Sequence, residues 1–371
     1  MKNISFLSIL FCISLIMITS CKSINNNIEE VEKVELNLST ATLFARQIES
    51  SVSMANPDFF NKAFDENDIK KTISDNSIIY SSFDTDFGNL FFESNFKLGD
   101  EAVSIIDHGG DVRAIHTYEQ NGEYHIIVRT YRDFHINIDD YVLDTVNNQI
   151  KIKDGFNYNF STSFSNKARY NMLFNILNKT NSEGVTSLLI EANNLLNAKK
   201  TQEARKLLIE NKELLKEYPI YWQLYIQSVY ESDKKGYLQF LDNLKVEGFD
   251  ERSILLHKLL FFTHQGKVEE TEQIVNEIIE YTGDDPIYLF FFGLANFNAG
   301  EYESALYCYE NVTTGMPMIW DIWHCKLECY YKLNWRESFD DALELGKDLY
   351  GIDDGELARM VEKNFTKFSG K

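Results

Sequence analysis

The chain has 371 residues, of which 44% are apolar, 14% are aromatic and only four are Pro, a composition typical of packed domains and not of a long disordered chain. At roughly 150 residues per domain, this length predicts about two domains. The formal charge of −21 argues against a nucleic-acid partner and favours basic peptides, basic protein patches or divalent cations, although acidic residues also serve plain solvation.

The N-terminus has the pattern of an export signal. Residues 4–18 form an apolar run after Lys2, which suits the core of a signal peptide and is short for a membrane span. The tetrad Ile18-Thr19-Ser20-Cys21 resembles the bacterial lipobox, so residues 1–20 are expected to be a lipoprotein signal peptide. The resemblance implies lipidation of Cys21, palmitate included. The usual signal for retention in the inner membrane resembles an Asp after the Cys, whereas Lys22 follows here, so the resemblance implies an outer-membrane lipoprotein that faces the periplasm or the outside. An ordinary secretory signal or an uncleaved anchor is the alternative.

The next two segments are a tether and a helical region. Residues 21–38 are polar and rich in Asn and Glu, which predicts a lipidated tether. The region 39–165 then opens with helical signals over 39–54 and 57–73, the second beginning with Pro and Asp as helices often do. An apolar patch over 87–106 predicts further helix in parts.

Beyond residue 111 the apolar period changes from that of a helix to that of a strand. Asn121-Gly122 lies between two alternating segments and predicts a β-hairpin, because both turn positions need positive φ. A second hairpin is expected across Asn147-Asn148, where Ile150 and Ile152 alternate with Lys and predict one buried and one solvated face. Helices followed by antiparallel hairpins make region 39–165 an α+β domain.

This α+β region resembles the cone-shaped nuclear-transport-factor-2 and cystatin-like folds, in which a curved sheet wraps on helices. The resemblance implies either an enzyme, a small-molecule binder or an inert binding module. Four residues on or beside the strands are candidates for acid-base work in such a pocket: His116, His125, Asp133 and His135. The simpler interpretation is that these residues lie at the surface or in a hydrogen-bonded core. For residues 107–110, which could suggest a catalytic turn, an ordinary turn entering the first strand is the simpler interpretation.

The C-terminal half repeats at a fixed spacing. Ala204, Thr271, Ala305 and Ser338 recur in matching helical contexts at intervals of 67, 34 and 33 residues. A period near 34 is that of helix hairpins, each too small to bury its own apolar face. The clearest unit begins at Pro286 and matches the tetratricopeptide pattern at the following residues: Gly293, Ala295, Gly300, Tyr302, Ala305, Tyr309 and Pro317. We therefore expect residues 185–371 to form an all-α tetratricopeptide solenoid of about five helix hairpins.

The resemblance also implies where a ligand lies, because the first helix of every unit in this family lines a concave groove. Transferred by register, the partner groove comprises ten residues: Gln223, Gln227, Tyr230, Phe290, Leu294, Phe297, Asn298, His324, Glu328 and Tyr331. This set is aromatic and mildly acidic, unlike the basic groove of family members that clamp a peptide carboxylate. An apolar helix or extended segment fits it better, while packing against neighbouring repeats or the N-terminal domain is an equal alternative for residues 290–292.

Signals of chemistry are few. The sequence has no G-x-x-x-x-G-K-[ST], G-x-G-x-x-G, H-E-x-x-H, calcium-loop or nucleophile-elbow motif, so we expect no cofactor and no catalytic residue. Cys325 and Cys329, next to His324, suggest a metal site or a disulfide. The repeat register gives Cys329 the small packing position instead, and two Cys one helical turn apart bridge poorly, so no metal site is expected.

These features predict a non-enzymatic scaffold on the outer membrane that binds a protein partner of the cell envelope through its groove. Two alternatives stay open: a surface lipoprotein that captures glycans, which resembles another group with tetratricopeptide helices, and an enzyme or small-molecule binder that uses the sheet.

Overall fold

The computed structural model describes residues 34–74, 97–170 and 184–365. The expected signal peptide 1–20, Cys21 and the tether up to residue 33 lie outside the described residues, as does the part of the apolar patch before residue 97. None of the helices in the described ranges is both long and apolar enough to cross a membrane.

Short helices come first. The longest starts at Leu38 because Asn37 caps it: the Asn37 side chain accepts a hydrogen bond from the Thr40 backbone N–H, and the Thr40 hydroxyl accepts one from the Asn37 N–H. The first described helices are α2 (Leu38–Ser53), α3 (Asp58–Asn61), α4 (Glu66–Ser74) and α7 (Leu98–Asp107).

A sheet of five antiparallel strands follows, in the order β1-β2-β3-β4-β5. Both predicted hairpins are confirmed: Asn121-Gly122 joins the first pair and Asn147-Asn148 the second, with all four residues at positive φ. A third tight turn, which we did not predict, uses Asp133 and Phe134. The strands are β1 (Asp111–Gln120), β2 (Glu123–Arg132), β3 (His135–Val146), β4 (Gln149–Asn157) and β5 (Thr162–Ser163).

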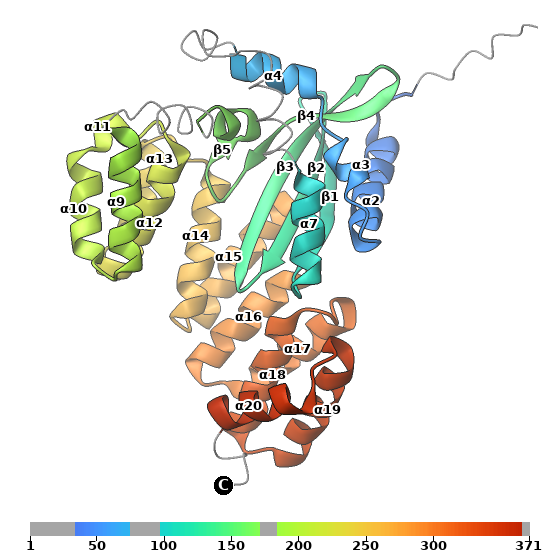
Figure 1. The fold of residues 1–371 in the computed structure, drawn as a ribbon, viewed down its shortest axis with the longest axis vertical. Coiled ribbons are helices and arrows are strands. Elements are labelled where there is room, and N and C mark those ends of the chain that lie inside the picture. The colour runs from blue at the N-terminus through green and yellow to red at the C-terminus, as the bar shows by residue number, and fades with distance from the viewer. Residues whose placement is uncertain (1–33, 75–96, 171–183, 366–371) are drawn as a thin grey trace, which may run out of the picture. The chain divides into compact units, whose positions relative to one another are not determined.

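One buried and one solvated face is predicted for the second hairpin, and this pattern does not extend to the middle of the sheet. Four consecutive residues of β2, Ile126 to Arg129, are buried, which requires both faces to be covered. Ile126 and Val128 pack against α2 and α7, whereas Ile127 and Tyr131 belong to a core shared with the C-terminal helices. Figure 1 shows the strands between these two sets of helices. Buried and exposed side chains alternate as predicted in the first half of β4, where Ile152 is buried and Lys153 is exposed.

The C-terminal helices form five consecutive pairs within residues 184–365, numbered here as repeats 1 to 5, and a final helix. The pairs are α9 (Val185–Asn197) with α10 (Thr201–Glu210), α12 (Pro219–Ser232) with α13 (Tyr237–Val246), α14 (Glu251–His264) with α15 (Val268–Thr282), α16 (Pro286–Ala299) with α17 (Tyr302–Gly315), and α18 (Trp320–Leu333) with α19 (Arg336–Tyr350). The short α11 (Lys212–Leu215) follows the first pair, and α20 (Asp354–Asn364) ends the described chain. The fold class, an α+β region joined to an all-α solenoid, is confirmed.

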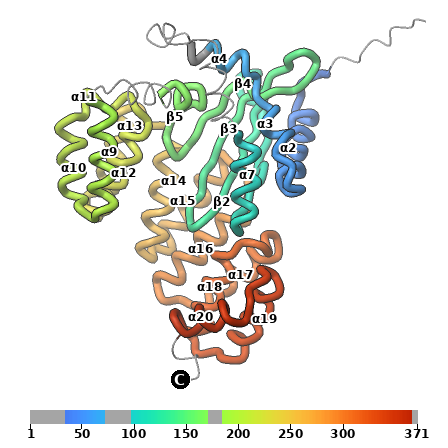
Figure 2. Tube along the Cα trace, viewed as in Figure 1, coloured from blue at the N-terminus to red at the C-terminus, as the bar shows by residue number. Residues whose placement is uncertain are grey.

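Small residues allow the two helices of repeat 4 to approach each other. A Cβ at Gly293 would lie 2.6 Å from the Tyr309 ring and 2.9 Å from the Cys308 Cβ, so only Gly fits there. Ala305 is fully buried on the opposing helix. Gly300 ends α16 in the left-handed conformation, at φ +90°. These are the roles that the repeat pattern predicts. Figure 2 follows the chain through the successive pairs to the C-terminal helix.

Candidate functional site

The sheet packs against the first helices of the array. Tyr131 on β2 is buried against Phe290 and Phe291 of α16, with ring centroids 5.6 and 6.4 Å apart and near-perpendicular rings. Further along the sheet, Ile138 and Tyr158 share this core with Leu255 and Leu256 of α14. The N-terminal halves of these first helices therefore contact the chain's own sheet.

The turn between β2 and β3 is held in place by Asp321 in the first turn of α18. One Asp321 carboxylate oxygen accepts hydrogen bonds from the Tyr131 hydroxyl at 2.9 Å and from the Phe134 backbone N–H at 3.1 Å. The Phe134 ring also stacks at 6.1 Å on Phe290. Phe134 has φ +63°, a conformation that costs a bulky residue roughly 1–3 kcal/mol, and these contacts offset that cost.

A buried charged cluster joins the sheet to repeat 4. Arg129, 0% exposed, places Nη2 2.7 Å from Asp111 on β1 and 3.2 Å from Asp285. Asp285 also caps α16, because its carboxylate accepts from the Ile287 N–H at 2.7 Å. Burial lowers the pKa of Arg129, but the Asp285 and Asp111 carboxylates raise it by more, so the guanidinium stays charged. Beside it, Arg113 donates to the Gly315 carbonyl oxygen at 2.6 Å.

A second polar cluster surrounds Asp140 on β3. This carboxylate accepts from the hydroxyls of Tyr118 at 2.5 Å and Tyr158 at 3.0 Å, and it lies 3.0 Å from His125 Nδ1 and 3.4 Å from Arg252 of α14. Burial raises the Asp140 pKa, but the hydrogen bonds from His125 and Tyr118 lower it by more. With four donors around one carboxylate, the cluster has the composition of a structural link between sheet and array.

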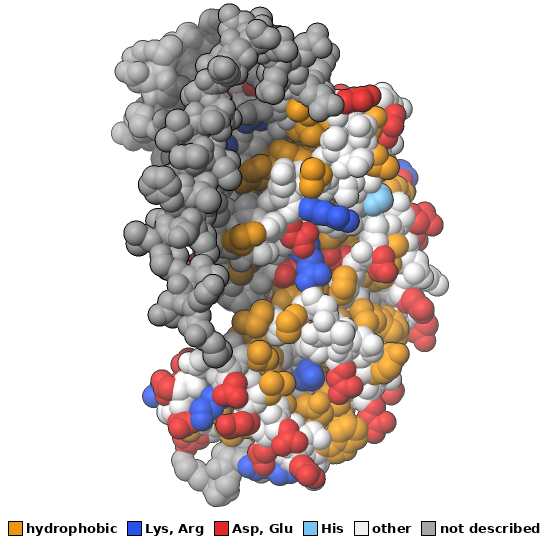
Figure 3. Space-filling view, turned by 90° about the vertical axis from the view of Figure 1, so that its right-hand side faces the viewer, with side chains coloured by type: hydrophobic (Ala, Val, Ile, Leu, Met, Phe, Trp, Pro, Cys, Tyr) orange, Lys and Arg blue, Asp and Glu red, His pale blue; other side chains and the backbone are white. Residues whose placement is uncertain are grey.

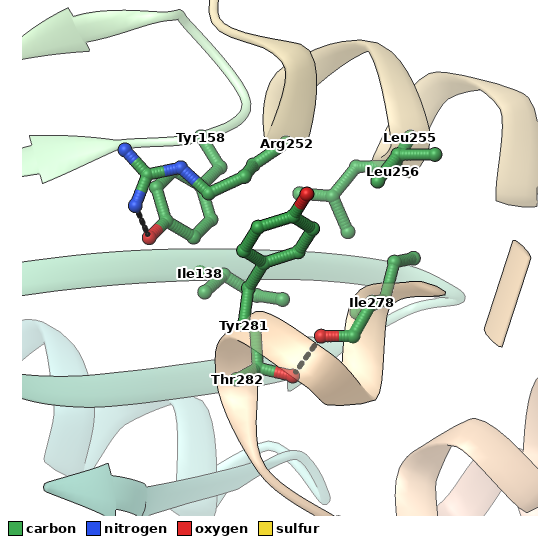
Figure 4. Close-up of a pocket in the computed structure, with 8 residues that line it drawn as sticks. All are labelled: Ile138, Tyr158, Arg252, Leu255, Leu256, Ile278, Tyr281 and Thr282. Carbon is green, nitrogen blue, oxygen red and sulfur yellow. Dashed lines mark hydrogen bonds between the residues drawn. The ribbon is translucent and has the colours of Figure 1, made fainter. Parts of the chain in front are cut away.

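The four acid-base candidates do not form one group. His116 and His125 stack on either side of Tyr118, whereas Asp133 and His135 lie at the far end of β2, about 26 Å along the strand at 3.3 Å per residue. A cavity next to this cluster, lined by Tyr158, Arg252 and six neighbours, has a volume of about 10 Å³ (Figure 4). That volume is enough for about one water molecule and is too small for a substrate.

The ten predicted groove positions differ in access. Phe290 is 0% exposed and packs the sheet, so it is not available to a partner, which corrects the prediction for that residue. Gln223, Gln227 and Asn298 are exposed, and the other six are partly exposed: Tyr230, Leu294, Phe297, His324, Glu328 and Tyr331.

Several of the accessible positions connect neighbouring repeats. Tyr230 of α12 lies 6.3 Å from both Phe261 and His264 of α14. Asn298 of α16 donates to the Thr263 carbonyl oxygen at 3.0 Å. These contacts link α12 to α14 and α14 to α16. We use the name lower groove for six of the accessible predicted positions that lie in the C-terminal halves of the first helices. It comprises Tyr230, Leu294, Phe297, Asn298, Glu328 and Tyr331.

The last described residue, Phe365, borders this groove at repeat 5. Phe365, 1% exposed, packs 5.4 Å from Tyr331, 5.9 Å from His324 and 5.0 Å from Phe339. His324 Nδ1 lies 3.6 Å from a Glu328 oxygen on the next turn. Phe365 thus covers the apolar end of repeat 5 and leaves part of Tyr331 exposed.

The three described cysteines are free and buried in repeats 4 and 5. Burial raises the pKa of the Cys308 thiol to about 11 and that of Cys329 to about 12, which keeps both protonated. Cys329 is 0% exposed, as its packing position predicts. The described residues contain no group of three or more His, Cys, Asp or Glu side chains placed to hold a metal ion.

Neither a protein-family model nor a curated protein matches this chain. Among solved structures it is similar to a tetratricopeptide repeat protein from Parabacteroides merdae, at 12% identity and a TM-score of 0.39, over 55% of this chain and 82% of that one. It is also similar to a chain of the APC/C hetero-tetramer Cut9–Hcn1, at 16% identity and a TM-score of 0.35, over 57% of this chain and 42% of that one.

Proposed function

We propose that this protein is a non-enzymatic scaffold of the cell envelope, held at the outer membrane by a lipid on Cys21, which binds a protein partner through the lower groove. The observation that supports this best is the row of partly exposed aromatic and polar side chains that the sheet and Phe365 leave uncovered. Phe297 is central to it, because its ring packs at 5.3 Å on Tyr302 and the residue remains partly exposed.

The lower groove suits an apolar segment with few acidic residues. Its aromatic and aliphatic members, Tyr230, Leu294, Phe297 and Tyr331, are the residue types that anchor partners at interfaces. Glu328 adds a carboxylate that is 37% exposed and so remains available to a donor from the partner. Lys234 lies 5.7 Å over the Tyr230 ring, but none of the six residues is itself a Lys or Arg that would bind a peptide carboxylate.

In this proposal the sheet has a structural role. It packs against the N-terminal halves of the first helices. A small-molecule binder or an enzyme that used this face of the sheet would need a cavity there. Because Arg129, Asp140 and Asp321 fix it at three points, the sheet holds the relative positions of repeats 3, 4 and 5. A partner would then meet a groove that is already in its binding shape, which lowers the entropic cost of association.

Two variants test the groove. Phe297→Glu and Tyr331→Glu place carboxylates in the lower groove and should abolish recovery of the envelope partner that co-purifies with the unchanged protein. Leu345→Glu is the matched control, because Leu345 is 56% exposed on α19, outside the groove. The unfolding midpoint of each variant must also be measured, so that a loss of partner recovery can be distinguished from a loss of folded protein. An unchanged partner complex in both groove variants contradicts the proposal.

The anchor is tested separately. Metabolic labelling with an alkyne fatty acid should mark the protein in its native host, and Cys21→Ser should lose the label and move the protein from the membrane to the soluble fraction. Persistent labelling of the Cys21→Ser protein would contradict lipidation at that residue.

A further inference from the structure

The charges of this chain are separated along its sequence. Between Lys267 and Lys326 there is no Lys or Arg, whereas the same stretch contains eleven Asp and Glu. It comprises α15, α16, α17 and the start of α18. Elsewhere the two signs are mixed, and Figure 3 shows Lys and Arg among the Asp and Glu of one face. Asp285 and Asp321 are buried and bonded within the protein, and the other nine acidic residues are at least partly exposed, so this stretch attracts cations along its surface.

Within this stretch a trough of about 470 Å³ opens between α15 and α16, in the size range of binding pockets. Val275 and Ile279, one turn apart on α15, form one apolar wall, and Leu289 and Phe292 of α16 form the other. All four are only partly buried. The apolar strip therefore runs along the direction of the two helices, which suits an elongated occupant.

The rim of the trough is acidic. Glu272 and Asp284 line it, both are exposed, and neither makes a hydrogen bond or ion pair with another described residue. Asn311 contributes from α17, and one turn before it Tyr307 is 69% exposed. An exposed aromatic ring on the adjoining helix and two carboxylates without an ion-pair partner among the described residues each suit a Lys or Arg side chain.

The trough is distinct from the lower groove. On α16 the groove residues Leu294 and Phe297 share one face with Phe290, whereas Leu289 and Phe292 are turned from these three residues by roughly 80–160° at 100° per residue. Two ligands can therefore contact different sides of the same helix.

We propose that this trough binds an amphipathic helix of a protein partner, with apolar side chains between α15 and α16 and Lys or Arg facing Glu272 and Asp284. The binding mode is that of a helix in an apolar groove. The charge separation selects a basic partner, and it disfavours a second copy of this acidic chain. The inference does not depend on the lower groove.

The test uses the whole chain and two synthetic amphipathic helices, one with Leu on one face and Lys on the other, and one with Glu in place of Lys. Fluorescence anisotropy should show binding of the Lys peptide only. Glu272→Lys with Asp284→Lys should weaken it at least about tenfold, and Ile279→Glu should weaken it similarly. Added salt should reduce affinity for the unchanged protein.

A matched control separates the trough from the overall charge. Glu337→Lys with Glu344→Lys makes the same change of net charge on exposed positions of α19. The proposal requires this pair to leave affinity within about twofold; an equal loss would show that the peptide follows the overall charge, and would overturn the proposal. A loss on Phe297→Glu alone would assign the peptide to the lower groove and also overturn it, without affecting the proposed function.

Discussion

The buried Arg129 cluster gives the sharpest stability prediction. Arg129→Met removes the cation and leaves Asp285, 2% exposed at its side chain, without its partner. At 3.2 Å and an effective dielectric constant of 20, the attraction between the two charges is about 5 kcal/mol, and desolvation offsets part of it. Removing one partner of a buried pair typically costs about 3–5 kcal/mol, so we expect a loss of that size in the free energy of unfolding.

Urea unfolding followed by circular dichroism measures this loss. Asp285→Asn keeps the helix cap, because Asn also caps well, and it removes the charge. The double variant should therefore be more stable than the sum of the two single losses predicts, by about 1.5 kcal/mol or more. Arg132→Met is the control: its ion pair with Asp133 is exposed, and we expect a change within about 0.5 kcal/mol. A loss below about 1 kcal/mol for Arg129→Met, or additive losses, would refute the reasoning.

Three further predictions follow from single residues. Burial raises the pKa of Asp139 to about 6 from an ordinary 3.8, so its contribution to stability is fully present below pH 3.8 and is lost as the pH rises through 6. Relative to Asp139→Asn, the unchanged protein should lose about 1.4 kcal/mol of unfolding free energy between pH 5 and 7.5, and parallel pH profiles would contradict this. Gly346→Ala should destabilise the protein by about 1–3 kcal/mol, because the added Cβ would lie 2.0 Å from the Trp323 ring. Gly315→Ala, whose Cβ would make only ordinary contacts, should change the stability by less than about 0.5 kcal/mol. Equal midpoints of the two variants in thermal unfolding would contradict the close approach of Gly346 to Trp323. Phe365→Ala should cost about 3–5 kcal/mol in urea unfolding, and a loss under about 1 kcal/mol would show that the described chain end does not pack on repeat 5.

The repeats could be predicted from the sequence because each constraint is local. Gly293 and Ala305 are required by contacts within one helix pair, and Gly300 by its positive φ, so a single unit contains the reason for each. The hairpin turns at residues 121–122 and 147–148 are local in the same way. In contrast, the turn at Phe134 has no such signal, since this aromatic residue at positive φ is stabilised by Asp321 and Phe290, both far along the chain.

The position of the sheet on the array could not be predicted for the same reason. From the sequence, Arg129 on β2 has the pattern of an exposed polar position in an alternating strand. Its burial is explained only by its ion pair with Asp285, which is distant in the sequence. Phe290 has the register of a groove residue and becomes a core residue only through Tyr131. One signal was available: Asp285 before Pro286 is a helix-start pattern, although it gives no hint of the second, ionic role. The likeness of region 39–165 to nuclear-transport-factor-2 and cystatin-like folds stays a prediction.

The most direct test of the scaffold proposal is site-specific photo-crosslinking in the native host. A benzoylphenylalanine in place of Phe297 lies in the lower groove, and one in place of Leu345 lies outside it on α19. We predict a discrete adduct with a protein partner from position 297 and none from position 345. An absence of adduct at 297, or the same adducts from both positions, would contradict the claim that this protein binds its partner through the groove that its own sheet leaves open.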